Sequence, residues 1–219
     1  MEKLAIAIDG PAGAGKSTIS KLVANRINLN YIDTGAMYRA ITYKVINNGI
    51  EFDDKVEIIK LLNSTSIDFN HNHIYLDGKN VDKEIRENKI SKNVSYIAKI
   101  KEVREKMVEI QRKIASNKSV IMDGRDIGTH VLPKADFKFY INASVEERGR
   151  RRYEELKEKN FDTTLKKIIE EIKNRDRIDS TREISPLRKS EDAFEIDTTN
   201  LTIDQVVDKI IKTIEKRRE

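Results

Sequence analysis

Residues 10–17, with the sequence GPAGAGKS, fit the pattern Gly-x-x-x-x-Gly-Lys-Ser/Thr and constrain the fold more than any other segment. An apolar run at residues 3–9 precedes them and predicts a buried strand, and an amphipathic pattern over residues 15–27 predicts a following helix. In such a loop, glycines let backbone N–H groups turn inward around phosphate oxygens at the positive end of the helix dipole. The alternative is a glycine-rich turn that only links a strand to a helix. We favour phosphate binding because both flanking elements stand where the motif requires them.

The residue types in this loop indicate which phosphates it binds. Lys16 supplies a positive charge for the β- and γ-phosphates, and the Ser17 hydroxyl can reach a Mg²⁺ ion. We therefore predict that the chain binds a nucleoside triphosphate through the residues of this loop and its continuation, namely Gly10, Pro11, Ala12, Gly13, Ala14, Gly15, Lys16, Ser17 and Thr18.

Along the rest of the chain, predicted strands alternate with predicted helices. Further strands are predicted at residues 30–33, 119–123, 137–142 and 193–197. Further helices are predicted at residues 35–48, 55–63, 99–116, 145–159, 164–178 and 202–216. Residues 66–81 alternate apolar and polar side chains around two turn signals, Asn-His-Asn and Asp-Gly, and predict a small β-hairpin. Strands separated by helices imply an α/β fold with a parallel sheet covered on both faces.

Composition excludes several classes of function. The 219 residues suit one large domain and include no cysteine, which excludes disulfides, thiolate catalysis and cysteine-based zinc sites. No apolar run approaches the roughly 20 residues of a membrane helix, and no signal-peptide pattern is present, so we expect a cytoplasmic protein without a membrane partner. The formal net charge of +5 could attract nucleic acid, but 6% aromatic residues and no tryptophan do not support that partner.

The phosphate loop alone does not define a reaction, because kinases, GTPases, motor ATPases and helicases share it. The chain lacks an Asn-Lys-x-Asp guanine motif and is too short for the second lobe of a helicase. A small kinase or a stand-alone ATPase remains.

Two segments that follow predicted strands are candidates for a second substrate site. In DTGAMYR (33–39), Thr34 and Gly35 open a helix and Arg39 lies one turn further on, an arrangement that suits an anion. A Thr N-cap with Arg39 on an exposed face explains this segment equally well. In DGRDIGT (123–129), Asp123 could hold Mg²⁺ while Arg125 and Asp126 protrude at the carboxyl edge of the sheet. We favour function there over a plain Asp- and Gly-rich turn.

Two charged segments, residues 150–159 and 173–182, have two interpretations. A solvated helix is the usual one, whereas in a kinase with a phosphate loop an arginine-bearing lid closes over the transferring phosphate. In the second segment Arg175, Asp179 and Arg182 share one face if it is helical. The histidines suggest no site: His71 and His73 are typical turn residues, and nothing assigns a role to His130.

Taken in order, these motifs resemble the bacterial cytidylate kinase (CMP/dCMP kinase) family over essentially the whole chain. The matching segments are IDGPAGAGKST, YIDTGAMYR, LDGKNVDKEIR, DGRDIGT, RDRIDSTR and DTTNLTIDQVV. The resemblance implies a three-layer α/β/α fold with a five-stranded parallel core, an inserted NMP-binding domain and a helical lid. The core would comprise residues 1–33, 90–147 and 183–219, the NMP-binding domain 34–89 with a β-rich insertion at about 63–88, and the lid 148–182.

The resemblance also implies a reaction and residue roles. The expected reaction is Mg²⁺-dependent, in-line transfer from ATP to CMP or dCMP by a monomer, with a kinase for UMP or AMP as the other enzyme interpretation. The phosphate of CMP would be held by Thr34, Arg39, Arg125 and Arg182. The cytosine edge would be recognised by Ser95, Arg104 and Asp126, and the sugar would be contacted by Arg175 and Asp179. The charge-stabilising residues would be Lys16, Arg125, Arg151, Arg152 and Arg182, with Ser17 and Asp123 at the metal. Without the resemblance, Ser95 and Arg104 read as exposed helix surface. Ser17 stands where many relatives have Gly and so adds a hydroxyl. Thr34 replaces the commoner Ser and keeps one.

Overall fold

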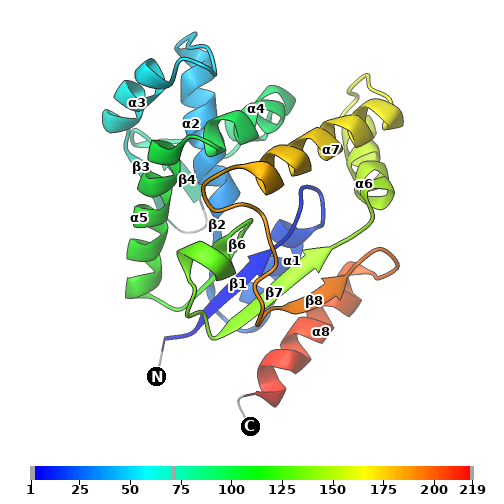
Figure 1. Cartoon of the computed structure of the whole chain (residues 1–219). Helices are drawn as coiled ribbons and strands as arrows, with labels where there is room; N and C mark the ends of the chain where they lie inside the picture. Colours follow the sequence, from blue (N-terminus) through cyan, green and yellow to red (C-terminus); the bar gives the residue numbers. More distant parts are fainter. Residues whose placement is uncertain (1–2, 71–72, 218–219) are drawn as a thin grey trace.

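The computed structural model describes residues 3–70 and 73–217, and its centre is a parallel sheet of five strands in the order β2-β6-β1-β7-β8 (Figure 1). The three inner strands are mostly apolar and buried, as expected when both faces of a parallel sheet are covered, and all five strands are short. Their bounds are β1 (Ala5–Asp9), β2 (Asn30–Asp33), β6 (Val120–Gly124), β7 (Phe137–Asn142) and β8 (Phe194–Asp197). The predicted α/β class and five-stranded parallel sheet are therefore confirmed.

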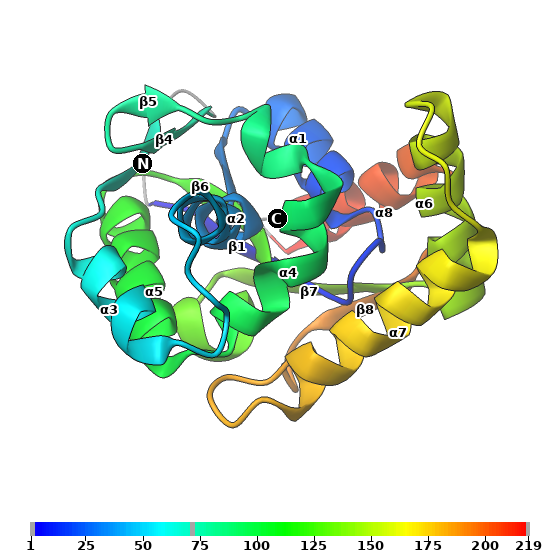
Figure 2. The same ribbon diagram turned by 90° about the horizontal axis from the view of Figure 1, so that it is seen from above.

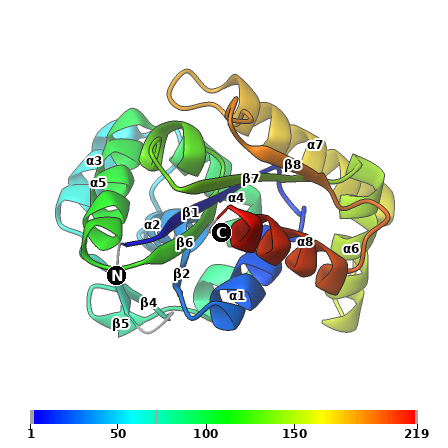
Figure 3. The same ribbon diagram turned by 90° about the horizontal axis from the view of Figure 1, so that it is seen from below.

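Helices cover both faces of the sheet and make two apolar cores. On one face, α1 (Lys16–Arg26) and α8 (Ile203–Lys216) lie side by side, as Figure 3 shows from below. Ile19 and Val23 of α1 pack there with apolar residues of α8 such as Val207. On the other face lie α2 (Thr34–Asn47), α3 (Lys55–Asn63), α4 (Asn88–Ala98) and α5 (Lys101–Asn117). Because all five strands are parallel, their carboxyl ends lie at the same edge of this three-layer arrangement.

Between the hairpin region and residue 99 the sequence analysis gives no helix bounds, although it reads Ser95 as helix surface; the structure has α4 there. Its sequence, NKISKNVSYIA, is rich in Asn and Ser, which are weak helix formers. Its apolar residues nevertheless recur with helical spacing and are buried, namely Ile90, Val94, Ile97 and Ala98. Burial of this stripe against the second core outweighs the weak local preference.

Residues between α3 and α4 form a small separate sheet. Strands β3 (Ile67–Asn70), β4 (His73–Leu76) and β5 (Lys79–Asn80) pair antiparallel, and the 3₁₀ turn η1 (Glu84–Arg86) follows. The predicted two-stranded hairpin is thus extended by a third strand, with Gly78 at φ 79° in the turn between β4 and β5. The other predicted turn includes His71 and Asn72, which lie outside the described residues.

Two antiparallel helices complete the fold. The helices α6 (Val145–Glu158) and α7 (Leu165–Thr181) pack on each other through Leu156, Ile168 and Ile172. Seen from above, α7 runs beside α4 over the end of the sheet (Figure 2). Both charged segments predicted as helices are therefore helical, and α7 is three residues longer than predicted at its C-terminal end.

Candidate active site

A cavity of about 800 Å³ lies at the carboxyl edge of the sheet, where α/β folds bind their ligands. It is lined by the phosphate loop, the start of α2, the segment after β6, and residues of α4, α5, α6 and α7. The cavity therefore brings together segments that are far apart in the sequence. Most of the site residues predicted from the sequence line it, including Lys16, Thr34, Arg125 and Asp179.

The phosphate loop has the backbone that its glycines predict. Gly13 and Gly15 have φ of 76° and 83°, in the left-handed region. A Cβ at Gly10 would lie 1.9 Å from the carbonyl oxygen of Ile141, so this position requires glycine. Lys16 is buried, and its Nζ donates to the carbonyl oxygen of Pro11 at 2.7 Å. Burial and the nearby charge of Arg125 hold the pKa of Lys16 well below its usual value.

Oxygen atoms gather where α1 begins beside the end of β6. The Ser17 hydroxyl donates to Asp123 Oδ2 at 2.8 Å, and the Tyr31 hydroxyl donates to Asp123 Oδ1 at 2.8 Å. Burial, together with the charge of Asp33, raises the pKa of Asp123 to about 6. The described residues contain no group of three or more His, Asp or Glu side chains placed to bind a metal by themselves. Ser17 and Asp123 thus form a pair of hard oxygen donors beside the phosphate loop.

The start of α2 is organised by Asp33, a residue that the sequence analysis did not select. Its carboxylate caps the helix by accepting from Ala36 N at 2.8 Å, and it pairs with Arg39 at 2.9 Å and Arg86 at 2.7 Å. Burial opposes ionisation of Asp33, but the charges of Arg39 and Arg86 lower its pKa. The Thr34 hydroxyl instead donates to the carbonyl oxygen of Asp123 at 2.6 Å. The alternative of a Thr N-cap with Arg39 on an exposed face is therefore wrong.

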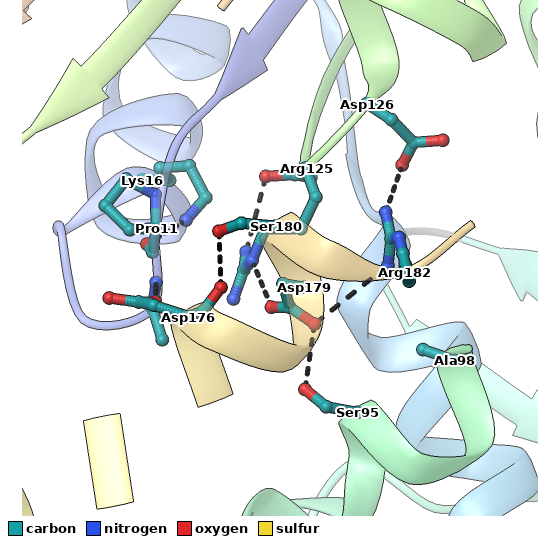
Figure 4. A network of polar contacts seen from close by, with 12 residues as sticks. Pro11, Lys16, Ser95, Ala98, Arg125, Asp126, Asp176, Asp179, Ser180 and Arg182 are labelled. Carbon is teal, nitrogen blue, oxygen red and sulfur yellow. Dashed lines mark hydrogen bonds and ion pairs between the residues drawn. The ribbon is translucent and has the colours of Figure 1, made fainter. Parts of the chain in front are cut away.

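The segment after β6 joins the end of α7 through a network of charges (Figure 4). Arg125 Nε lies 2.9 Å from Asp179 Oδ2, and the Ser95 hydroxyl donates to Asp179 Oδ1 at 2.9 Å. Burial opposes ionisation of Asp179, but the neighbouring arginines, Arg125 first among them, lower its pKa. Asp179 thus links α4, α7 and the DGRDIGT segment at the cavity wall.

A second part of the network surrounds Asp126. Arg104 pairs with Asp126 Oδ2, and Arg182 Nη2 lies 3.4 Å from Asp126 Oδ1. The Arg104 guanidinium also lies over the Tyr38 ring, 5.5 Å from its centroid. The side chains of Arg104 and Asp126 are only 2% and 6% exposed. Reading Arg104 and Ser95 as helix surface is therefore wrong, because α4 and α5 turn these polar residues toward the cavity.

Arg175 lines the same cavity from α7. Its side chain is partly buried, its Nε atom is fully buried without a hydrogen-bond partner among the described residues, and burial and the charge of Arg125 lower its pKa to about 10. Arg182 is the C-cap of α7 rather than part of the helix, so only Arg175 and Asp179 share a helical face. Because Arg175 Nε is buried without a partner in the described part of the chain and lies beside further arginines, this wall is suited to bind an anion.

The arginines of α6 differ in what they contact. Arg151 donates to the carbonyl oxygen of Thr198 at 2.7 Å and to Glu147 at 2.8 Å, and Arg152 pairs with Glu155 at 2.7 Å. Both side chains line the cavity and are partly exposed. His130, in contrast, is exposed and does not line the cavity.

Asp9 is another buried carboxylate that the sequence analysis missed. It accepts hydrogen bonds from the backbone N–H groups of Ile127 and Gly128, at 2.8 and 2.7 Å. Burial raises its pKa to about 7. Asp9, Asp33 and Asp123 each stand at or near the end of a parallel strand, so an aspartate after an apolar run is the signal that could have identified Asp9 and Asp33.

We expect Asp9→Asn to lower the free energy of unfolding by roughly 1–3 kcal/mol at pH 5, because the amide nitrogen cannot accept a hydrogen bond and leaves one of the two N–H donors unpaired. In the wild type, the folded-state pKa of Asp9 lies above its unfolded value of 3.8. Between about pH 4 and pH 7 the Asp9 carboxyl therefore stays protonated in the folded protein but is ionised in the unfolded chain. The contribution of Asp9 to the free energy of unfolding falls as the pH rises through that window. The difference between wild type and variant should thus be larger at pH 5 than at pH 7.5 in urea titrations. An equal difference at both pH values would contradict the raised pKa.

None of the helices within residues 3–70 and 73–217 is long and apolar enough to cross a membrane.

Comparison with known proteins gives a consistent result. The family model described as cytidylate kinase matches residues 6–216. A cytidylate kinase of Clostridioides difficile (strain 630) is 56% identical over 214 residues, which cover 98% of this chain and 99% of the relative. A cytidylate kinase of Bacillus subtilis (strain 168) is 50% identical over 220 residues, covering 99% and 98% of the two chains. Among solved structures, an uncharacterized protein from Eubacterium ventriosum ATCC 27560 shares the fold, with a TM-score of 0.55, 14% identity, and coverage of 98% of this chain and 99% of that one.

Proposed function

The chain belongs to the cytidylate kinase family, and from this premise we propose that it transfers the γ-phosphoryl group of ATP to CMP and dCMP. The observation that carries the proposal is one cavity with two anion sites, the phosphate loop on one side and the wall formed by Arg125, Arg175 and Arg182 on the other. A phosphoryl donor and a phosphate acceptor can thus meet in one shared cavity. Catalysis then consists of alignment and charge neutralisation, without a covalent intermediate.

On the donor side, residues 10–18 bind the phosphates of ATP through backbone N–H groups, and Lys16 neutralises the β- and γ-phosphates. The bond from Lys16 to the carbonyl of Pro11 is exchanged for phosphate oxygens, whose charge favours the ammonium form of this buried lysine. Ser17 and Asp123 fit a Mg²⁺ ion, because they offer hard oxygen atoms and because Mg²⁺ takes few protein ligands beside phosphates and water. When bound, the ion would neutralise charge on the transferring phosphates.

On the acceptor side, the phosphate of CMP is bound by Thr34, Arg39, Arg125 and Arg182. The cytosine is recognised by Ser95, Arg104 and Asp126. The sugar is contacted by Arg175 and Asp179. The ion pairs already made by Arg39, Arg104 and Arg125 hold these side chains in place before substrate arrives. Preorganised charge costs little reorganisation at the moment of reaction. An oxygen of the CMP phosphate attacks the γ-phosphorus, and the bond from that phosphorus to the leaving ADP oxygen breaks.

The lid in this proposal is formed by residues 148–182, and the division into core, NMP-binding domain and lid stays a prediction, as does the monomeric state. We expect Arg151→Gln or Arg152→Gln to lower kcat by about 100-fold with little change in CMP affinity, because these charges act on the transition state. Steady-state kinetics and calorimetry with CMP measure the two effects. Lys157→Gln, at an exposed position of the same helix, is the control. An unchanged kcat would assign these arginines to the solvated surface.

A coupled assay of ATP-dependent turnover on CMP, dCMP, UMP, AMP and GMP tests the proposed function directly. Turnover on CMP and dCMP well above the other three is the expected result. Preferential use of UMP or AMP would replace the substrate assignment, and no turnover on any monophosphate would overturn the proposal.

A further inference from the structure

Two lid residues grip the phosphate loop at Ala12. The Ala12 N–H donates to Asp176 Oδ1 at 3.0 Å, and the Ala12 carbonyl accepts from Arg148 Nη1 at 2.8 Å. Arg148 and Asp176 also pair with each other at 2.5 Å. Both backbone groups of one loop residue are thus satisfied by a single ion pair, which we name the Ala12 clamp.

The clamp is firmly placed at the start of the lid. The Arg148 side chain is buried, and its Nε donates to the carbonyl of Ala143, the residue that follows β7, at 2.9 Å. A Cβ added at Gly13 would lie 3.4 Å from the Cβ of Arg148, so the loop and α6 are in close contact. A buried guanidinium with partners on three sides resists displacement, because each partner left behind would be an unpaired polar group.

The same helix that supplies Asp176 also supplies the acceptor wall. Arg175 precedes Asp176 directly, and Asp179 follows it by less than one turn of α7. Asp179 in turn binds Ser95 and Arg125. In Figure 4, Asp176 lies toward Pro11 and Lys16 of the phosphate loop, whereas Asp179 lies toward Ser95 on α4. A rigid helix therefore connects the two anion sites of the cavity.

We propose that Arg148 and Asp176 are positioning residues that couple donor binding to acceptor binding. The inference rests on the proposed function, since it assigns ATP to the phosphate loop and CMP to the wall. A triphosphate that fixes the loop also fixes Ala12, and through the clamp it fixes the placement of Arg175 and Asp179. Coupling between two binding sites is reciprocal, so CMP must strengthen donor binding by the same factor.

The test is calorimetry of CMP binding with and without a saturating non-hydrolysable ATP analogue and Mg²⁺. In the wild type we expect the analogue to tighten CMP binding by about tenfold. Asp176→Asn keeps the shape and an acceptor for Ala12 but removes the charge that holds Arg148. We expect the variant to bind each ligand alone within about threefold of wild type, with a coupling factor near one. Glu170→Gln removes the same charge at an exposed position of α7 and should leave the coupling unchanged.

A purely electrostatic role of Asp176 gives a different result. Loss of its negative charge would then tighten both anionic ligands while leaving the coupling factor intact, and that outcome would overturn the proposal. A wild-type protein whose CMP affinity does not change when the ATP analogue is added would also overturn the proposed coupling, but it would leave the proposed function intact. Failure of the wild type to bind CMP at all would overturn both the proposed coupling and the proposed function.

Amide hydrogen exchange of the wild type provides a second measurement that does not depend on a folded variant. We expect the Ala12 N–H to be protected in the free protein and more strongly protected when CMP alone is added. Unprotected exchange, or protection that does not respond to CMP, would contradict the clamp.

Discussion

Replacing Lys16 with alanine is expected to lower kcat by at least about 10³-fold while CMP affinity changes by less than about twofold. Lys16 is buried at the phosphate loop, and its amino group donates a hydrogen bond to the loop's own carbonyl at Pro11. It is therefore free to neutralise charge that develops on the transferring phosphate, whereas the acceptor wall lies on other segments. Coupled assays give kcat, and calorimetry gives the affinity for CMP.

The matched control is Lys21→Ala, which removes an exposed lysine from the same helix. The control should keep full activity, because loss of surface charge alone is screened by solvent. A folded Lys16→Ala protein that no longer bound CMP would show that the donor and acceptor sites are not separate. Retention of near-normal turnover would remove Lys16 from the catalytic machinery.

Local patterns were sufficient for most of the fold. Each strand of the parallel sheet is a short apolar run, and α1, α2 and α5 carry clear apolar periodicity, so their existence follows from burial on one or both faces. Helix α4 was not predicted, because its Asn and Ser residues weaken the local helix preference and mask an apolar stripe that the packed core then buries. The third strand, β5, consists of Lys79 and Asn80 and has no apolar signal at all.

The residues of the candidate site were less predictable from local patterns than the fold was. The phosphate loop and Asp123 follow from spacing, because their chemistry needs fixed residue types after a strand. Ser95 and Arg104 were selected only through the family resemblance, since burial of a polar residue on a helix depends on what packs against it. Arg148 and Asp176 were not selected as site residues, because contacts with Ala12 join segments distant in the sequence. Such tertiary contacts leave no local pattern.

The Arg104–Asp126 pair allows a sharp prediction about the base. Cytosine presents an amino group and an acceptor nitrogen, whereas uracil presents a carbonyl and an N–H. An ionised Asp126 only accepts hydrogen bonds and Arg104 only donates, so this pair suits cytosine and leaves polar groups unpaired against uracil. Because both side chains are buried and held by each other, neither can turn away to relieve the mismatch without breaking an ion pair. A site of this kind rejects the wrong ligand strongly.

We therefore expect CMP and dCMP to be preferred over UMP, and Asp126→Asn or Arg104→Met to reduce the ratio of kcat/KM for CMP to that for UMP by at least about tenfold, or ~1.4 kcal/mol. Asp126→Asn is the sharper variant, because its amide can donate to the uracil carbonyl and should raise UMP activity in absolute terms. Thermal unfolding of each variant checks that the broken pair has not unfolded the protein. A native enzyme that used UMP as well as CMP would refute base reading by this pair. Variants that lost activity on both substrates in proportion would instead show that Arg104 and Asp126 support the cavity wall without distinguishing the base.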